Sequence, residues 1–389
     1  MFKICYISTL PITIKSFFLG ELSYMREKGA VVTVICGHDP ELNDALSDKG
    51  IEFVPLDIPR GMDFGGTVRS TRKLVRIFKS CQYDMIQYCT PNASLCASIA
   101  GRLSDIKICN YHMMGIRYLS ENGCKKWMLK KLERLTCLLS TDIEVVSNSN
   151  LHLAQSEELF PPGKGVVIWN GSSGGVDLDR FRLDKKNIWR EEIREKLGIA
   201  EEVTLYGFVG RLNREKGIEE LIMAFKALDE AIPRKVALLL VGEKENSGEI
   251  SSWVWAYIER KENIFLAGHQ NNIEKYFAAM DVLVFPSHRE GFGNVVIEAE
   301  AMEIPVISNS IPGPLDAMVN NVTGQFAEPF NVNDLLEKMK YILDGENRKT
   351  LSKHSRNYIE NHFDSKVLLE YIWKRKVDLL CKHEIIMCP

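Results

Sequence analysis

The stretch that most constrains the fold runs from residue 281 to residue 307. It opens with an apolar run, 281–285, which is typical of a buried parallel strand. A polar turn with two glycines follows, then an alanine-rich segment that favours a helix, and then a second apolar run at 304–307. A strand, a helix and a returning strand in this order predict a parallel sheet covered by helices, and hence an α/β fold.

The glycines of this stretch lie where the helix begins. Gly291 and Gly293 carry no side chain, so backbone N–H groups at the helix start can face a ligand, and such a helix end favours anions. Glu290 stands just before this end and Glu298 within the helix. Eight residues at helical rise would separate them by roughly 12 Å. This spacing fits a ligand with an anionic centre and hydroxyl-rich ends, such as a nucleotide-sugar.

The pair Glu290 and Glu298, with Gly-Phe-Gly between them, resembles the Glu-x7-Glu motif of retaining family-4 glycosyltransferases. The resemblance implies the GT-B fold, which has two facing Rossmann-like, doubly wound parallel-sheet domains with a cleft between them. It also implies that Glu298 holds the ribose and that Glu290 approaches the donor sugar. Glu300 and Glu303 are interpreted as ordinary solvated carboxylates of the helix.

A second segment, 210–217, follows an apolar strand at 203–209 and resembles the Gly-Arg…Lys-Gly segment of the same family. The resemblance implies that Arg211 and Lys216 clamp the diphosphate. Two fixed cations would lower the barrier as the leaving diphosphate gains charge, and the Arg fork matches phosphate oxygens. Because two cations and a helix end can replace a metal, we expect a metal-independent reaction without a cofactor.

The residues expected to bind the donor are therefore Glu298, Gly291, Phe292, Gly293, Asn294, Gly210 and His269. His269 follows an apolar run at 264–267 and is placed near the nucleotide base, although a surface or loop role is an equal alternative.

On the acceptor side, a strand predicted at 107–111 ends in His112. Several family members place a histidine at this point, close to the donor sugar. His112 could then hydrogen-bond the sugar or help a proton move. A packed or surface histidine is the alternative. The expected catalytic residues are Glu290, Arg211, Lys216 and His112.

Two predicted helices of the first half, 67–79 and 125–135, are basic and amphipathic. Such helices bind anionic membranes. We expect peripheral binding at the inner face of the cell membrane, where a polyprenyl-diphosphate-linked saccharide would be the acceptor. Core-facing helices with a solvated charged side are the alternative.

Composition excludes several classes of function. The 389 residues carry a net charge of -3, which gives no nucleic-acid signature. None of the ten cysteines forms a C-x-x-C pair, so we expect buried thiols in a reducing compartment and no metal site. The first residues read as a strand rather than a signal peptide, and no apolar run reaches membrane-span length. We expect a cytoplasmic protein.

The order of predicted elements indicates two domains. Strands and helices alternate on both sides of a segment at 170–177 that is rich in glycine and serine, which marks a joint. We expect an acceptor-binding Rossmann-like domain at 1–172, a nucleotide-sugar-binding one at 173–362, and a last helix at 363–389 that crosses back to the first domain.

The sequence as a whole predicts a retaining glycosyltransferase that moves a sugar, most simply from a UDP-sugar, to a lipid-linked saccharide. The pattern resembles bacterial enzymes of capsule, exopolysaccharide or O-antigen synthesis, most strongly from 203 to 330. Two alternatives stay open: a GT-B UDP-sugar epimerase, which needs no acceptor, and a catalytically silent subunit that binds a nucleotide-sugar.

Overall fold

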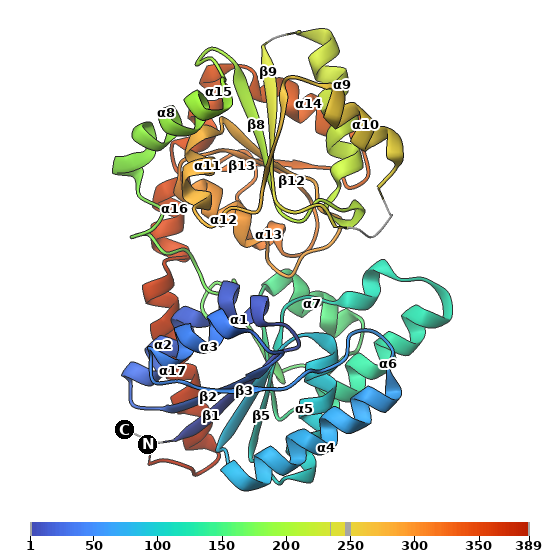
Figure 1. Ribbon diagram of the computed structural model, residues 1–389, viewed down its shortest axis with the longest axis vertical. Coiled ribbons are helices and arrows are strands. Elements are labelled where there is room, and N and C mark those ends of the chain that lie inside the picture. The colour runs from blue at the N-terminus through green and yellow to red at the C-terminus, as the bar shows by residue number, and fades with distance from the viewer. Residues whose placement is uncertain (1, 234, 246–249, 388–389) are drawn as a thin grey trace. The chain divides into compact units, whose positions relative to one another are not determined.

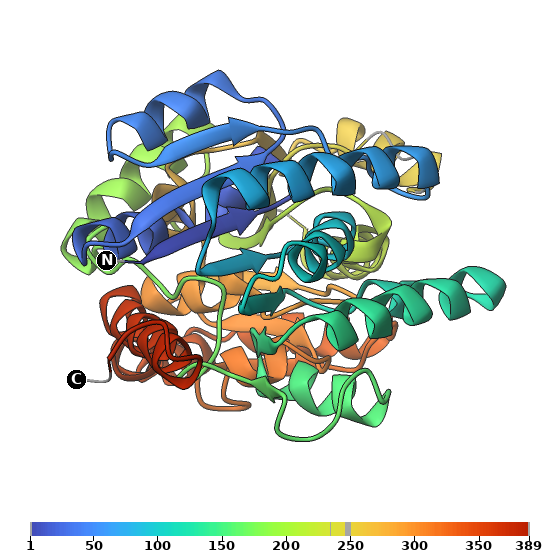
Figure 2. The ribbon, with the colours of Figure 1, turned by 90° about the horizontal axis from the view of Figure 1, so that it is seen from below.

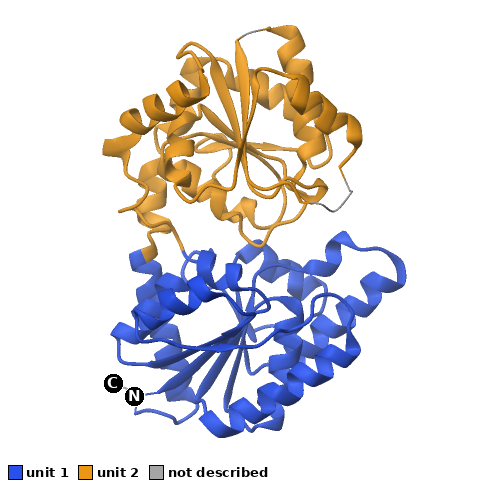
Figure 3. Cartoon of the chain, viewed as in Figure 1, with its two compact units in different colours: residues 1–174, 366–389 blue, residues 175–365 orange. Residues whose placement is uncertain are grey.

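The computed structural model describes residues 2–233, 235–245 and 250–387. The chain divides into two compact units (Figure 3). Unit 1 comprises residues 1–174 and 366–389, and unit 2 comprises residues 175–365. The sequence places the corresponding boundaries after residues 172 and 362. The last segment of the chain thus belongs to the same unit as the first.

Unit 1 is built on a seven-stranded parallel sheet (Figure 1). Its strand order is β3-β2-β1-β4-β5-β6-β7. The strands are β1 (Lys3–Ile7), β2 (Val31–Cys36), β3 (Glu52–Pro55), β4 (Met85–Tyr88), β5 (Ile108–Met113), β6 (Asp142–Val145) and β7 (Gly165–Val166).

Helices cover both faces of this sheet, because alternate residues of each strand point to opposite sides. The helices are α1 (Pro11–Phe17), α2 (Leu19–Glu27), α3 (Pro40–Ser47), α4 (Phe64–Cys81), α5 (Pro91–Leu103), the short η1 (Arg117–Ser120), α6 (Gly123–Leu139), α7 (Asn148–Ser156) and α17 (Ser365–Lys382). One core lies between the sheet and α4 to α7, and the other lies under α1, α2, α3 and α17. Figure 2 shows α6 and α17 on different sides of the strands.

Unit 2 repeats the architecture with a six-stranded parallel sheet in the order β10-β9-β8-β11-β12-β13. The strands are β8 (Thr204–Val209), β9 (Val236–Val241), β10 (Ile264–Gly268), β11 (Val282–Phe285), β12 (Val306–Asn309) and β13 (Gly324–Ala327). The helices are η2 (Leu183–Lys185), α8 (Lys186–Leu197), η3 (Arg214–Lys216), α9 (Ile218–Ala231), α10 (Ser252–Arg260), α11 (Ile273–Ala279), α12 (Asn294–Ala301), α13 (Pro314–Ala317), α14 (Val332–Ile342), α15 (Gly345–Ser352) and α16 (Ser355–His362).

The two parallel-sheet units confirm the predicted α/β fold class. In each sheet the strand order reverses once, between β1 and β4 in unit 1 and between β8 and β11 in unit 2. Ligands of such sheets bind at the carboxyl ends of the strands on either side of this reversal. In unit 2 the loops at that point are the two segments that the sequence assigns to the donor.

Several predicted elements differ from the structure. The apolar pattern of residues 14–28 predicts one helix, but the structure breaks it at Phe18, which is buried between α1 and α2. The strand predicted at 107–111 continues to Met113, so His112 lies within β5 rather than after it. The apolar run at 166–169 predicts a strand, but β7 has only two residues, and no sequence pattern predicts β13.

Candidate functional site

Two loops of unit 2 lie against each other at the carboxyl edge of its sheet. The loop after β8 contains Glu215, whose backbone carbonyl accepts a hydrogen bond from the backbone N–H of His288 at 2.9 Å. Arg289 donates to the Glu215 carboxylate at 2.6 and 2.8 Å. A Cβ on Gly217, whose φ is +73°, would lie 2.0 Å from the carbonyl oxygen of Pro286. Only glycine permits this approach, so Gly217 fixes the two loops side by side.

Lys216 and Glu290 form an ion pair across these two loops. Their side chains are 16% and 12% exposed, so the pair is largely withdrawn from solvent. The Asn213 side chain accepts a hydrogen bond from the backbone N–H of Lys216 at 3.0 Å and holds η3 in place. The Lys216 ammonium also stands 5.4 Å from the centre of the Phe285 ring. The predicted phosphate-binding cation thus lies beside the carboxylate predicted to meet the sugar.

Arg211 has different partners. Its guanidinium donates to both carboxylate oxygens of Glu245 at 3.0 Å, and its side chain is 55% exposed. It also lies 3.9 Å from Glu215. Burial alone would raise the pKa of Glu215, but Arg289, Lys216 and Arg211 outweigh it and hold that pKa below its usual value. Glu215 therefore remains an anion among these three cations.

The start of α12 departs from the geometry that the sequence suggested. The helix begins at Asn294, after Gly293 with φ +92°, so the residues from Glu290 to Gly293 are a turn rather than helix. The estimate of roughly 12 Å between the two glutamates, made at helical rise, therefore does not apply. Phe292 is 2% exposed and packs edge-on against Phe363 at 5.3 Å between ring centres, so its side chain anchors the loop.

A third loop, after β12, joins this arrangement, and no sequence pattern predicts a role for it. A Cβ on Gly313, whose φ is +97°, would lie 3.1 Å from Glu290 Cβ and 3.1 Å from the carbonyl carbon of Gly291. Asn309, at the end of β12, donates its side-chain amide to the carbonyls of Pro286 at 2.9 Å and Ser287 at 3.1 Å. These contacts position the Glu290 turn from its other side.

Glu298 lies in α12 and is partly buried. Burial raises the pKa of Glu298 to about 7. The positive charge of Arg180 opposes this rise, and the negative charge of Glu274 adds to it. Arg180 donates to Glu274 at 2.8 Å. Arg180 comes from the segment just after the predicted joint, and no sequence signal linked it to Glu298. The free protein therefore holds a carboxylate here whose charge is only partly compensated.

Glu300 corrects a prediction. The sequence predicts it on the solvated side of the helix, but it is fully buried, and α16 packs against α12. Neither carboxylate oxygen has a hydrogen-bond partner among the described residues. Burial raises the pKa of Glu300 well above its ordinary value, opposed by Thr323. Glu303, in contrast, has a side chain that is 42% exposed.

The remaining predicted residues lie in three places. Gly210, with φ +148°, ends the strand segment before Arg211, and its carbonyl oxygen lies against Gly242 of the loop after β9. His269 is exposed at the end of β10. His112 is buried in unit 1, whereas every other predicted site residue belongs to unit 2.

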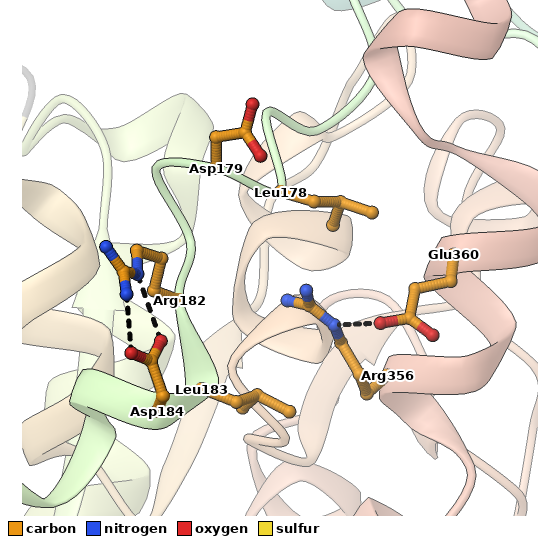
Figure 4. A pocket seen from close by; sticks show the side chains of 7 residues that line it. All are labelled: Leu178, Asp179, Arg182, Leu183, Asp184, Arg356 and Glu360. Carbon is orange, nitrogen blue, oxygen red and sulfur yellow. Dashed lines mark hydrogen bonds and ion pairs between the residues drawn. The ribbon is translucent and has the colours of Figure 1, made fainter.

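A separate recess of about 560 Å³ also lies in unit 2 (Figure 4). Its lining residues are Leu178, Asp179, Arg182, Leu183, Asp184, Arg356 and Glu360. Four of its five charged side chains already pair with each other, Arg182 with Asp184 and Arg356 with Glu360, each at 2.6 Å. No predicted site residue lines it, and we assign it no part in the function.

Comparison with known proteins identifies the family. The family described as Glycosyltransferase Family 4 matches residues 20–180, and that described as Glycosyl transferases group 1 matches residues 189–362. The capsular polysaccharide biosynthesis glycosyltransferase CapM of Staphylococcus aureus is 30% identical over 90% of this chain and 90% of its own length. The chain belongs to the family-4 glycosyltransferases.

Two further comparisons extend this assignment. An Escherichia coli UDP-Gal:alpha-D-GlcNAc-diphosphoundecaprenol alpha-1,3-galactosyltransferase is 24% identical over 93% of both chains. The crystal structure of Anabaena HepE in complex with UDP and glucose superposes with a TM-score of 0.80 over 97% of this chain and 100% of that one, at 18% identity. The GT-B fold expected for this glycosyltransferase is therefore confirmed, and its relatives include an enzyme of capsule synthesis.

Proposed function

We propose that this glycosyltransferase moves a sugar, with retention of anomeric configuration and without a metal ion, from a UDP-sugar to a polyprenyl-diphosphate-linked saccharide in bacterial surface polysaccharide synthesis. The observation that carries the proposal is the Lys216–Glu290 pair beside the start of α12. Two relatives named for capsule synthesis and for transfer to a diphosphoundecaprenol-linked sugar support the class of acceptor. The UDP bound in the HepE structure supports the donor.

The proposed mechanism follows from the charges around these loops. Lys216 and Arg211 face the diphosphate, together with the positive end of the α12 dipole. When the donor enters, its phosphates replace Glu290 as the partner of Lys216, and Glu290 is released to orient the sugar. Glu298 accepts hydrogen bonds from the ribose hydroxyls.

The bond between the anomeric carbon and the phosphate oxygen breaks as the acceptor oxygen attacks from the same side. The acceptor proton passes to an oxygen of the departing diphosphate. The positive charge that this step requires comes from side chains and helix dipole, which is why we propose that no metal takes part.

Membrane binding is proposed from the outer surface of unit 1. α5 packs against both α4 and α6, so these two basic helices lie in one layer. On α6 the side chains of Trp127, Leu135 and Leu138 are 66%, 38% and 69% exposed at helical spacing, and the Lys131 ammonium stands 5.6 Å over the Trp127 ring. Apolar and cationic groups on one helix face favour an anionic lipid surface. No helix within the described residues is long and apolar enough to cross a membrane.

The test of the reaction is product analysis. UDP- and GDP-sugars are first screened for protection against heat unfolding, since a ligand at about a hundred times its Kd adds about 2.7 kcal/mol. The protecting donor is then incubated with a polyprenyl-diphosphate-linked sugar, with and without EDTA. We expect a new glycoside that retains the donor's anomeric configuration, in equal yield with the chelator. An isomerised nucleotide-sugar would indicate an epimerase instead, and donor binding without any product would indicate a silent subunit.

The test of membrane binding is sedimentation with anionic phosphatidylglycerol vesicles at low salt. We expect wild type to pellet, and the variant Trp127→Ala/Lys131→Gln to pellet less. The matched control is Trp253→Ala/Lys353→Gln, which removes an exposed tryptophan and lysine from unit 2. Equal pelleting of all three proteins would contradict the assigned surface.

A further inference from the structure

A buried polar network crosses the face of the unit 1 sheet that α17 covers (Figure 1). Gln87 of β4 accepts a hydrogen bond from the Asn110 side chain of β5 at 2.9 Å and a second one from Lys376 of α17. Lys376 also donates to both oxygens of Glu144 in β6, at 2.9 and 2.8 Å. The Lys376 side chain is fully buried and that of Glu144 is 3% exposed.

His112 stands at the end of this network. It pairs in register with Glu144 of the neighbouring strand, and its Nδ1 lies 3.8 Å from Glu144 Oε2. Phe18 packs edge-on against the imidazole at 5.2 Å between ring centres, which limits its rotation. His112 is 8% exposed, and both of its ring nitrogens are buried without a hydrogen-bond partner among the described residues.

The charges around Glu144 keep it ionised. Burial alone would raise the pKa of Glu144, but the Lys376 ammonium, assisted by His112, outweighs burial and holds that pKa well below its usual value. An ionised carboxylate beside Nδ1 favours the proton on Nδ1, which leaves Nε2 of the neutral ring as an acceptor. A distance of 3.8 Å is longer than a hydrogen bond, and such contacts often tighten when the substrate is bound.

A buried ion pair is weak evidence for a role in stability. Removing two charges from water costs more than their attraction returns unless the geometry is favourable, and apolar replacements of both partners are often neutral or stabilising. A second acidic residue of β6, Asp142, already lies 3.4 Å from Arg375 and 3.4 Å from Lys382 of α17. The helix therefore has ion pairs with β6 besides the one that Lys376 makes.

We propose that Glu144 is a positioning residue for His112, and that Lys376, supplied by the last helix, keeps Glu144 charged, so that the neutral His112 ring carries its proton on Nδ1 and Nε2, which is buried in the free protein, is left to accept a hydrogen bond from a hydroxyl of the bound substrates. The inference deepens the proposed function and rests on it. It makes α17 part of the acceptor-side site rather than only a cover for the sheet.

The first test reads the tautomer without any activity assay. In wild-type protein labelled with ¹⁵N-histidine, the His112 signals are assigned by their loss in His112→Gln. We expect ring-nitrogen shifts that place the proton of the neutral ring on Nδ1. A proton on Nε2 in wild type would overturn the proposal, whether or not the protein transfers a sugar.

The second test separates positioning from folding. The double variant Glu144→Leu/Lys376→Met removes both charges, so we expect it to fold and to bind the donor as wild type does. We expect its kcat to fall at least about tenfold, with little change in the donor KM, and its His112 signals to move toward the Nε2–H form. The matched control, Arg375→Gln, removes the neighbouring ion pair of α17 and is expected to keep kcat within about twofold of wild type.

The outcomes distinguish the two proposals. If wild type forms no glycoside but His112 carries its proton on Nδ1, the proposed function fails and the positioning by Glu144 stands. If wild type is active and the double variant keeps its kcat, or Arg375→Gln loses as much, the positioning role is refuted. If the double variant does not fold, the tautomer of wild-type His112 decides alone.

Discussion

The substitution Glu298→Gln is expected to stabilise the free protein at neutral pH while removing its function. Burial raises the pKa of Glu298 from 4.5 to about 7. Between pH 4.5 and about 7, Glu298 of the unfolded chain has lost its proton while Glu298 of the folded protein still keeps it. The free energy of unfolding therefore falls as pH rises from about 4.5, and it is constant above about pH 7. A glutamine of the same shape carries no such penalty.

The size of the effect follows from that shift. A rise in pKa from 4.5 to about 7 corresponds to about 3 kcal/mol in the free energy of unfolding. Part of the Glu298 side chain is exposed and solvent weakens the effect, so we expect Glu298→Gln to be about 1–3 kcal/mol more stable than wild type above pH 7. For a unit of this size this raises the thermal midpoint by about 2–4 °C per kcal/mol. The assay is thermal unfolding of wild type and Glu298→Gln from pH 4.5 to 8, with the difference growing across that range.

A matched control and a second readout complete the experiment. Glu303→Gln removes an exposed carboxylate just beyond α12 and is expected to leave the pH dependence of the midpoint unchanged. In wild type, donor affinity should weaken as pH falls below about 7, because protonated Glu298 accepts ribose hydrogen bonds poorly. A midpoint difference that does not change with pH would refute the reasoning, and so would donor affinity unaffected by Glu298→Gln.

Three more substitutions test the site and its support. Glu300→Gln should raise the thermal midpoint by more at pH 8 than at pH 4.5, because burial raises the pKa of the Glu300 carboxyl. An equal rise of the midpoint at both pH values would contradict the raised pKa. Gly217→Ala should lower the free energy of unfolding clearly more than Gly198→Ala does, because both glycines have positive φ but only Gly217 contacts another loop. Equal losses, each of about 1 kcal/mol, would contradict a contribution of that contact to stability. In a steady-state assay, Lys216→Gln should lower kcat at least about a hundredfold. The control variant Arg214→Gln removes a side chain that is 65% exposed and should leave kcat unchanged.

The fold could be predicted from the sequence because its signals are local. Apolar runs such as 282–285 and glycine-terminated helices lie within short windows, and their alternation specifies a parallel sheet. The two loops that are proposed to bind the donor can be recognised in the sequence for the same reason. Their glycines and charges are close in sequence, and each loop follows a strand whose carboxyl end must meet the other at the same sheet edge.

The support of the site could not be predicted, since it depends on contacts between distant segments. Glu245 lies 34 residues from Arg211, and Glu274 lies 94 residues from Arg180. Gly313 touches the Glu290 turn from a different loop. Glu300 looked solvated because a helix in isolation does not show which of its sides a later helix, here α16, will cover.

Three glutamates of this chain, of which Glu144 and Glu300 are buried and Glu298 is partly buried, illustrate how position determines what a carboxylate does. Glu144 is compensated by a lysine that arrives from the other end of the chain, so it stays charged in the resting protein. Glu300 has no hydrogen-bond partner among the described residues, and burial raises its pKa well above the ordinary value. Glu298 lies between these extremes, because Arg180 compensates it only in part. A carboxylate in that intermediate state gains most from ligand hydroxyls, because these hydroxyls supply hydrogen bonds that the free protein does not make. The ribose binding proposed for Glu298 requires this property.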